Sequence, residues 1–238
     1  MKRTERHHLK ENELQTLARD ARERFEAKRR ETTAIIGIVA VVGAIAVGYL
    51  AWRERVQTKA AILLAEATAV KDARIGPPGT PEQGLRFINE RERAQAALTK
   101  FKTAADAYPS TDAGLYARYQ EAATWMALAN PAQAAATYQL VVDKAGDRLY
   151  GQMARLGLAE AQAVQGQYDP AINTYKELAQ RKEGPLPIDG ILLQLGRAYL
   201  GAGKRNEAQQ TFNRLVQEFP DSPFTGDARR ELDNLKKT

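Results

Sequence analysis

A fixed spacing of 37 positions recurs in the second half of the chain and restricts the folds open to it. An alanine recurs at this step (171 − 134 = 37; 208 − 171 = 37), an aromatic residue follows it by four positions, and an alanine or glycine precedes it by twelve. The residues are Ala122, Ala134 and Tyr138, then Ala159, Ala171 and Tyr175, then Gly196, Ala208 and Phe212. Such self-similarity is typical of stacked supersecondary units. The spacing therefore predicts a solenoid, an architecture that usually binds other molecules.

The last unit shows how one repeat is built. Its ordered positions are Leu192, Leu195, Gly196, Tyr199, Ala208, Phe212, Leu215 and Pro220. This pattern resembles the tetratricopeptide repeat (TPR), a pair of antiparallel helices of about 34 residues. Two helix axes approach to roughly 8–10 Å only where small side chains lie at the crossing, so we expect Gly196 and Ala208 there, beside Phe212. Pro220 is expected to end the second helix because proline cannot continue one.

Weaker copies precede this unit in the same register, and the earliest of them places Ala97 and Phe101 at the alanine and aromatic positions. Its first helix must come from upstream, where the Ala-rich stretch Gln57–Ala73 has a helical pattern. We predict an all-α solenoid of about three to four helical pairs, with an insertion loop at 74–84 and a capping helix at about 223–236. A generic Ala-rich bundle is the alternative, but it would not repeat four times in register.

Residues 33–50 contain no charged side chain. A helix of this length spans roughly 30 Å, the thickness of the hydrocarbon core of a bilayer. The sequence predicts an N-terminal transmembrane helix at 32–52, between a basic helical arm at 1–31 and a TPR-like domain at 53–238. A cleaved signal peptide is the alternative, although the apolar run is longer than the 7–15 residues typical of a signal core.

The charges beside this segment indicate its orientation. Ten Lys and Arg residues lie before it, and shortly after it come only Arg53, Arg55 and Lys59. Positive charge is retained on the cytoplasmic side. We therefore expect a single-pass protein of a bacterial inner membrane, with a cytoplasmic N-terminus and a periplasmic C-terminal domain. The basic arm is expected to lie near anionic lipid.

Small residues mark one face of the predicted span, at Gly37, Ala40, Ala44 and Gly48. Such spacing allows a second helix to approach closely, so this face is expected to pack against another membrane protein. The alternative is that alanine and glycine are simply common in membrane helices.

No catalytic or metal-binding pattern occurs in the sequence. His7 and His8 are the only histidines and there is no cysteine, so the three or four converging ligands of a metal site are missing. Phosphate loops, nucleophile elbows and zinc-protease motifs are absent as well. Of the net charge of +6, half is carried by the first 31 residues, with ten Lys and Arg against seven Asp and Glu, and half by the remaining chain. Neither region has the concentrated basic face of a nucleic-acid footprint. We predict neither enzymatic activity, nor a cofactor, nor binding of nucleic acid.

A groove for proteins is predicted from the TPR resemblance, since the first helix of each pair lines the concave side in that family. Matching positions give the groove residues Tyr116, Tyr119, Met126, Met153, Leu156, Glu160, Leu193 and Arg197. Tyrosine and methionine suit adaptable contacts with apolar peptide. The alternative is that the chain's own helices, either Gln57–Ala73 or the cap, fill the groove. Arg118, Arg155 and Arg229 recur near repeat steps and are expected to bond carboxylates or carbonyl groups between units.

The complete layout resembles the YfgM-like ancillary subunits of the SecYEG translocon, which have a short basic arm, one span and a periplasmic TPR domain. The segment Phe219–Phe224 is also similar to periplasmic repeats of cell-division and outer-membrane assembly proteins. The resemblance implies a translocon-associated adaptor or chaperone-like tether, whose groove contacts periplasmic proteins or unfolded polypeptide. An accessory or structural subunit of another membrane or envelope-assembly complex is the alternative.

Overall fold

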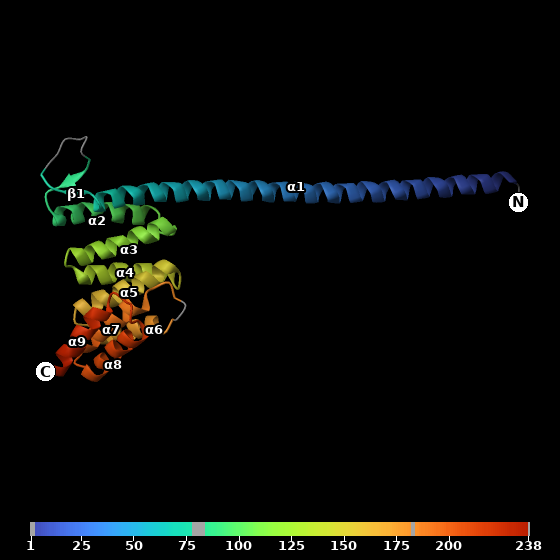
Figure 1. Cartoon of the computed structure of the whole chain (residues 1–238). Coiled ribbons are helices and arrows are strands. Elements are labelled where there is room, and N and C mark those ends of the chain that lie inside the picture. Colours follow the sequence, from blue (N-terminus) through green and yellow to red (C-terminus); the bar gives the residue numbers. More distant parts are fainter. Residues whose placement is uncertain (1–2, 78–83, 182–183, 238) are drawn as a thin grey trace. The chain divides into compact units, whose positions relative to one another are not determined.

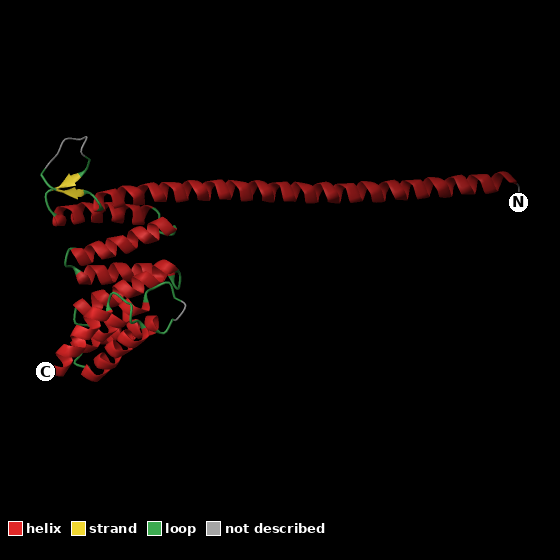
Figure 2. Cartoon of the chain, in the orientation of Figure 1, coloured by secondary structure: helices red, strands yellow, loops and turns green. Residues whose placement is uncertain are grey.

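A computed structural model describes residues 3–77, 84–181 and 184–237, with the side chains in the first thirty-two residues described only in part. Figures 1 and 2 show that helices dominate the chain. Their bounds are α1 (Arg3–Lys71), α2 (Glu90–Ala107), α3 (Asp112–Ala127), α4 (Pro131–Ala145), α5 (Leu149–Val164), α6 (Tyr168–Ala179), α7 (Ile188–Gly201), α8 (Arg205–Glu218) and α9 (Thr225–Lys237). The prediction of an all-α fold is confirmed.

The chain divides into two units, Met1–Arg55 and Val56–Thr238. The first unit consists of the N-terminal part of α1, so the segment predicted as a helical arm is helical from Arg3 onward. The side chains of His7 and His8 lie outside the described residues. From Thr33 on, α1 is long and apolar enough to cross a membrane.

The second unit is a stack of antiparallel helix pairs (Figure 1). Each helix from α2 to α8 packs against the helix that follows it in the chain. The C-terminal end of α1 supplies the first helix of the first pair, because Ala67 and Val70 are buried in one cluster with Phe101 of α2. This confirms the helix expected at Gln57–Ala73, although it ends two residues earlier, at Lys71. A second cluster joins α3, α4 and α5, and a third continues from α5 to α9.

Local capping explains where several helices begin and end. Asn89 begins α2, where its side chain accepts a hydrogen bond of 2.8 Å from the backbone N–H of Glu92. Thr111 caps α3 in the same way, through the N–H of Gly114 at 3.0 Å. At the other end of the stack, α8 stops at Glu218, just before Pro220, as predicted.

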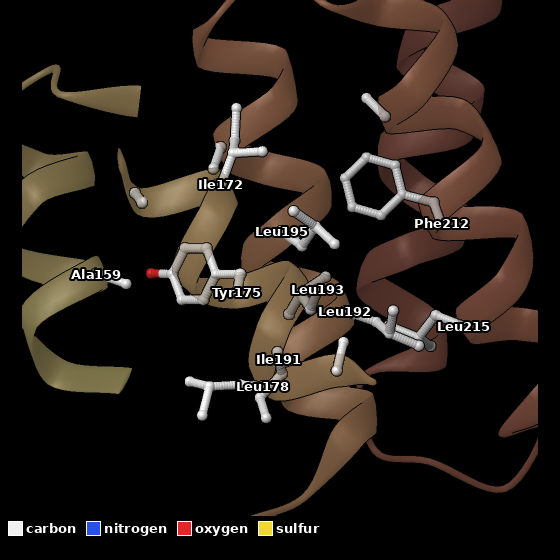
Figure 3. Close-up of a cluster of buried hydrophobic side chains, with 14 of the residues drawn as sticks. Ala159, Ile172, Tyr175, Leu178, Ile191, Leu192, Leu193, Leu195, Phe212 and Leu215 are labelled. Atoms are coloured by element: carbon white, nitrogen blue, oxygen red, sulfur yellow. The ribbon is translucent and has the colours of Figure 1, made fainter. Parts of the chain in front are cut away.

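The predicted small residue at a helix crossing is seen at Gly196. A Cβ atom at this position would lie 2.3 Å from Cε1 of Phe212, which is completely buried. Figure 3 shows Phe212 among the leucines of this cluster. A second close crossing was not predicted: the ring of Tyr138 on α4 covers Gly157 on α5, where a Cβ would lie 2.4 Å from Cζ. The aromatic residues of the repeat thus need glycine as their neighbour at these two places.

The two ends of the solenoid differ from its centre. At the C-terminal end, α9 occupies the range predicted for a capping helix and packs on α8, with Ala228 completely buried in the last cluster. Near the N-terminal end, the predicted insertion is bracketed by two short strands, β1 (Arg74–Ile75) and β2 (Arg86–Phe87). These strands pair in parallel, which the sequence did not indicate.

Candidate protein-binding groove

The first helices of successive pairs, α3, α5 and α7, carry the residues predicted to line a groove. Five of them are partly exposed and two, Glu160 and Arg197, are exposed. The five are Tyr116, Tyr119, Met126, Met153 and Leu156. Leu193 is different: it is only 2% exposed and belongs to the core cluster formed by α5 to α9. Leu193 therefore presents no side-chain surface to a partner, and the candidate groove is centred on α3 and α5.

Four tyrosine rings form a continuous cluster at this centre. The ring centroids of Tyr116 and Tyr119, one helical turn apart on α3, are separated by 6.1 Å. Tyr150 of α5 lies 5.5 Å from Tyr116, and Tyr138 of α4 lies 5.6 Å from Tyr119. The amide of Gln120 donates a hydrogen bond of 2.6 Å to the Tyr116 hydroxyl. Because rings at these distances attract one another, the cluster holds the two α3 tyrosines in defined positions.

Glu160 provides the negative charge of this region. Burial raises the pKa of Tyr119, and the nearby Tyr116 and the Glu160 carboxylate raise it further. The pKa of Tyr138 is raised by burial, by Tyr119 and by Glu160, and that of Tyr175 by burial and by Glu160. The Glu160 carboxylate is therefore within electrostatic reach of three phenol groups.

Charged side chains elsewhere on the first helices are paired. Arg197 of α7 donates to Asp227 at 3.2 Å and to Glu231 at 3.4 Å, both on α9. Arg118 bonds Asp106 of α2 and Glu121. The recurring Arg118 and Arg155 do bond carboxylates as expected, the latter pairing with Asp147 at 2.6 Å.

A pocket of about 460 Å³ opens where α1 ends, α2 begins and α3 ends. Three cations line it, Lys71, Arg91 and Arg93, together with small apolar and polar side chains. The other lining residues are Glu90, Ala94, Ala97, Gln120, Ala123, Thr124, Ala127, Leu128 and Ala129. Lys71 donates to the Gln120 amide oxygen at 2.9 Å, and Arg93 donates to the Ala73 carbonyl oxygen at 3.1 Å. This volume lies within the range of about 300–1,000 Å³ that is typical of ligand pockets. Ala123 and Ala127 lie about one and two turns after Tyr119 on α3, whereas the cations lie on α1 and α2.

Of the two helices proposed to fill the groove, one packs against α2 and the other covers the groove positions of α7. The C-terminal part of α1 packs against α2 through the cluster of Ala67 and Phe101. The cap, α9, packs against α8 and also covers groove positions of α7, because its Asp227 and Glu231 bond Arg197 and its Ala228 lies in one buried cluster with Leu193. Within the described residues, this leaves Tyr119 on α3 and Met153 on α5 partly exposed to solvent.

Comparisons with known proteins agree with this architecture. The family model described as "Tetratricopeptide repeat-like domain" matches residues 28–236. Among solved structures, the chain matches one from Podosopora anserina with a TM-score of 0.57. That structure is named as a kinesin light chain with TPR-like repeats that are nearly identical to one another. The identity is 14%, over 76% of this chain and 87% of that one. A variant form of those repeats gives 0.58, also at 14% identity, over 76% and 86% of the two chains.

YrrB, a TPR protein with an unusual peptide-binding site, matches with a TM-score of 0.49 at 18% identity, over 59% of this chain and 68% of that one. No curated protein matches the chain. The matches at this level of identity show the fold, and the family match covers most of the chain. The repeat is a protein-interaction fold, and the chain belongs to the tetratricopeptide repeat-like domain family.

Proposed function

We propose that this chain is a membrane-anchored protein-interaction scaffold that binds an extended segment of a partner polypeptide across α3 and α5. The observation that carries this proposal is the partly exposed row of tyrosine, methionine and leucine side chains in a TPR-like solenoid. Apolar and aromatic side chains that stay accessible on a concave surface typically mark a binding site. No catalytic role is proposed.

The anchor is proposed at 32–52, between the basic arm at 1–31 and the domain at 53–238. Its side chains support this, because the described apolar residues of the segment are all exposed, with Val47 at 68%. A continuous exposed apolar surface of this kind is unfavourable in water and favourable in a bilayer. With positive charge retained inside, the arm lies in the cytoplasm near anionic lipid and the solenoid in a bacterial periplasm.

The small-residue face of the anchor is proposed to pack against another membrane protein. In the first unit, no described atom lies within 4 Å of a Cβ placed at Gly37 or Gly48, so that face is open to a partner helix. Ala44→Leu combined with Gly48→Leu should weaken co-purification of that partner from mild detergent. Ala46→Leu, roughly half a turn from Ala44, is the matched control and should retain it. A double variant that retains every partner would show that the face is inert.

The resemblance to translocon ancillary subunits leads us to propose an adaptor or chaperone-like tether beside the translocon. Affinity purification of the full chain from mild detergent tests this directly. Recovery of translocon subunits supports it, whereas recovery of a different stoichiometric assembly supports the alternative of an accessory subunit of another membrane or envelope complex.

The groove can be tested separately from the anchor. Met153→Asp places a charge in the groove at a partly exposed position, and Asn173→Asp places the same charge at an exposed position of α6. The first variant should lose soluble partners while keeping membrane partners, and the second should keep both. Equal recovery of soluble partners by the two variants would refute binding in this groove.

A further inference from the structure

The groove across α3 and α5 contains one formal charge at the positions that face a partner. The matching positions of α3 are occupied by Tyr116, Tyr119, Met126 and two alanines, and those of α5 by apolar residues apart from Glu160. Glu160 is exposed, and among the described residues no cation lies within ion-pairing distance of its carboxylate. The groove is therefore negatively charged at this point.

Aromatic rings adjoin this charge. Tyr119 lies between Tyr116 and Tyr138, with centroid separations of 6.1 and 5.6 Å, and its ring remains partly exposed. The ring of Tyr138 covers Gly157, and Glu160 follows Gly157 by three residues on α5, about one helical turn, so the acid lies beside the pair of Tyr138 and Tyr119. The faces of these rings carry partial negative charge from their π electrons.

The neighbouring repeats lack this combination. The position of Glu160 is taken by Ala123 in the preceding repeat and by Arg197 in the last one. Arg197 is paired with Asp227 and Glu231, so it adds little net positive charge to the groove. The acid and its tyrosines thus form one local feature rather than a pattern repeated along the solenoid.

A cation is the group that this feature stabilises best. A guanidinium or ammonium group within about 6 Å of a ring centroid is attracted to the ring face. A carboxylate at the same place adds direct Coulomb attraction, which is stronger in a partly buried groove than in water. An acidic side chain would instead be repelled by both the carboxylate and the ring faces.

We propose that Glu160 and Tyr119 form a subsite for the Lys or Arg side chain of a partner polypeptide, with apolar partner residues on the adjoining Met153 and Leu156. The inference rests on the proposed function, because it specifies what the groove selects. It predicts that partners are extended apolar segments carrying a basic residue.

The test uses two fluorescent nonapeptides of leucine and serine that differ only at the central residue, arginine in one and citrulline in the other. Citrulline has nearly the shape of arginine and no charge. Fluorescence anisotropy with the full chain in nanodiscs should show the arginine peptide binding about five- to tenfold more tightly. The preference should shrink at about 1 M salt, where the Debye length is only about 3 Å.

Three variants assign the preference to the subsite. Glu160→Gln should remove most of it, and Tyr119→Leu should reduce it. Glu177→Gln removes an exposed acid of α6 and should leave the preference intact. Equal binding of the two peptides, or a preference that survives Glu160→Gln, overturns the subsite and leaves the groove proposal standing. If neither peptide binds the wild-type chain, the subsite falls together with the groove.

Discussion

Gly196→Ala gives the sharpest test of the packing inferred for the repeats. The added Cβ would lie 2.3, 2.6 and 2.7 Å from three ring atoms of Phe212, whereas ordinary contact begins at 3.4 Å. The ring would have to retreat by about 1.1 Å (3.4 − 2.3), and it is completely buried within the core of the solenoid. Overpacking of a core costs about 1–3 kcal/mol, here near the upper end, and alanine returns about 1 kcal/mol through helix propensity. We expect a net loss of about 1–2 kcal/mol.

The matched control is Gly226→Ala on α9, where no atom lies within 4 Å of the new Cβ. It should be neutral or stabilising by up to about 1 kcal/mol. Thermal unfolding of the purified chain, followed by circular dichroism, should show Gly196→Ala lowering the Tm by about 2–8 °C, since 1 kcal/mol corresponds to about 2–4 °C at this size.

A double-mutant cycle identifies the cause of the loss. In a Phe212→Leu background the clash is relieved, so Gly196→Ala should cost less there by more than about 0.5 kcal/mol. If Gly196→Ala is as stable as the wild type, or if Gly226→Ala loses as much, the helix crossing does not depend on this contact.

Three further outcomes follow from the structure. The hydrogen bond from Arg118 holds the pKa of Asp106 below its usual 3.8. The stabilisation from this pair is present above pH 4 and should be lost as the pH falls through the pKa of Asp106 in the folded chain. Over this pH range, the urea midpoint of the wild type should drop more than that of Arg118→Gln. Burial raises the pKa of Tyr138 and Tyr175, so spectrophotometric titration should show both phenol groups still neutral above pH 10. The free energy of unfolding should decline as the pH rises further, because only the unfolded chain releases these two protons. Asn89→Ala removes the cap of α2 and should cost about 1 kcal/mol in urea unfolding, and an unchanged midpoint would contradict the cap.

The repeat core was predictable from sequence because its residues recur in register. Ala134, Ala171, Ala208 and Phe212 are each completely buried, as the spacing indicated. Periodicity reports which residues share a helical face, and a face that recurs in every unit must be the one that packs against the neighbouring helices.

The groove was less predictable because exposure depends on neighbours that helical spacing does not encode. Leu193 holds the same motif position as Tyr119 and Leu156, yet it is buried in the cluster that extends to α9. Tyr150 completes the tyrosine cluster but precedes the motif positions of α5, so no recurring residue marks it. The cations of the pocket, such as Lys71 and Arg91, lie on opposite sides of the insertion and meet only in the folded chain.

Site-specific photo-crosslinking in living cells tests the central proposal most directly. A photoreactive amino acid at Leu156, partly exposed on α5, is compared with one at Asn173, exposed on α6. We predict crosslinks from position 156 to other polypeptides and few from position 173. Crosslinks from position 156 that occur only within the same chain would contradict a groove that binds partners.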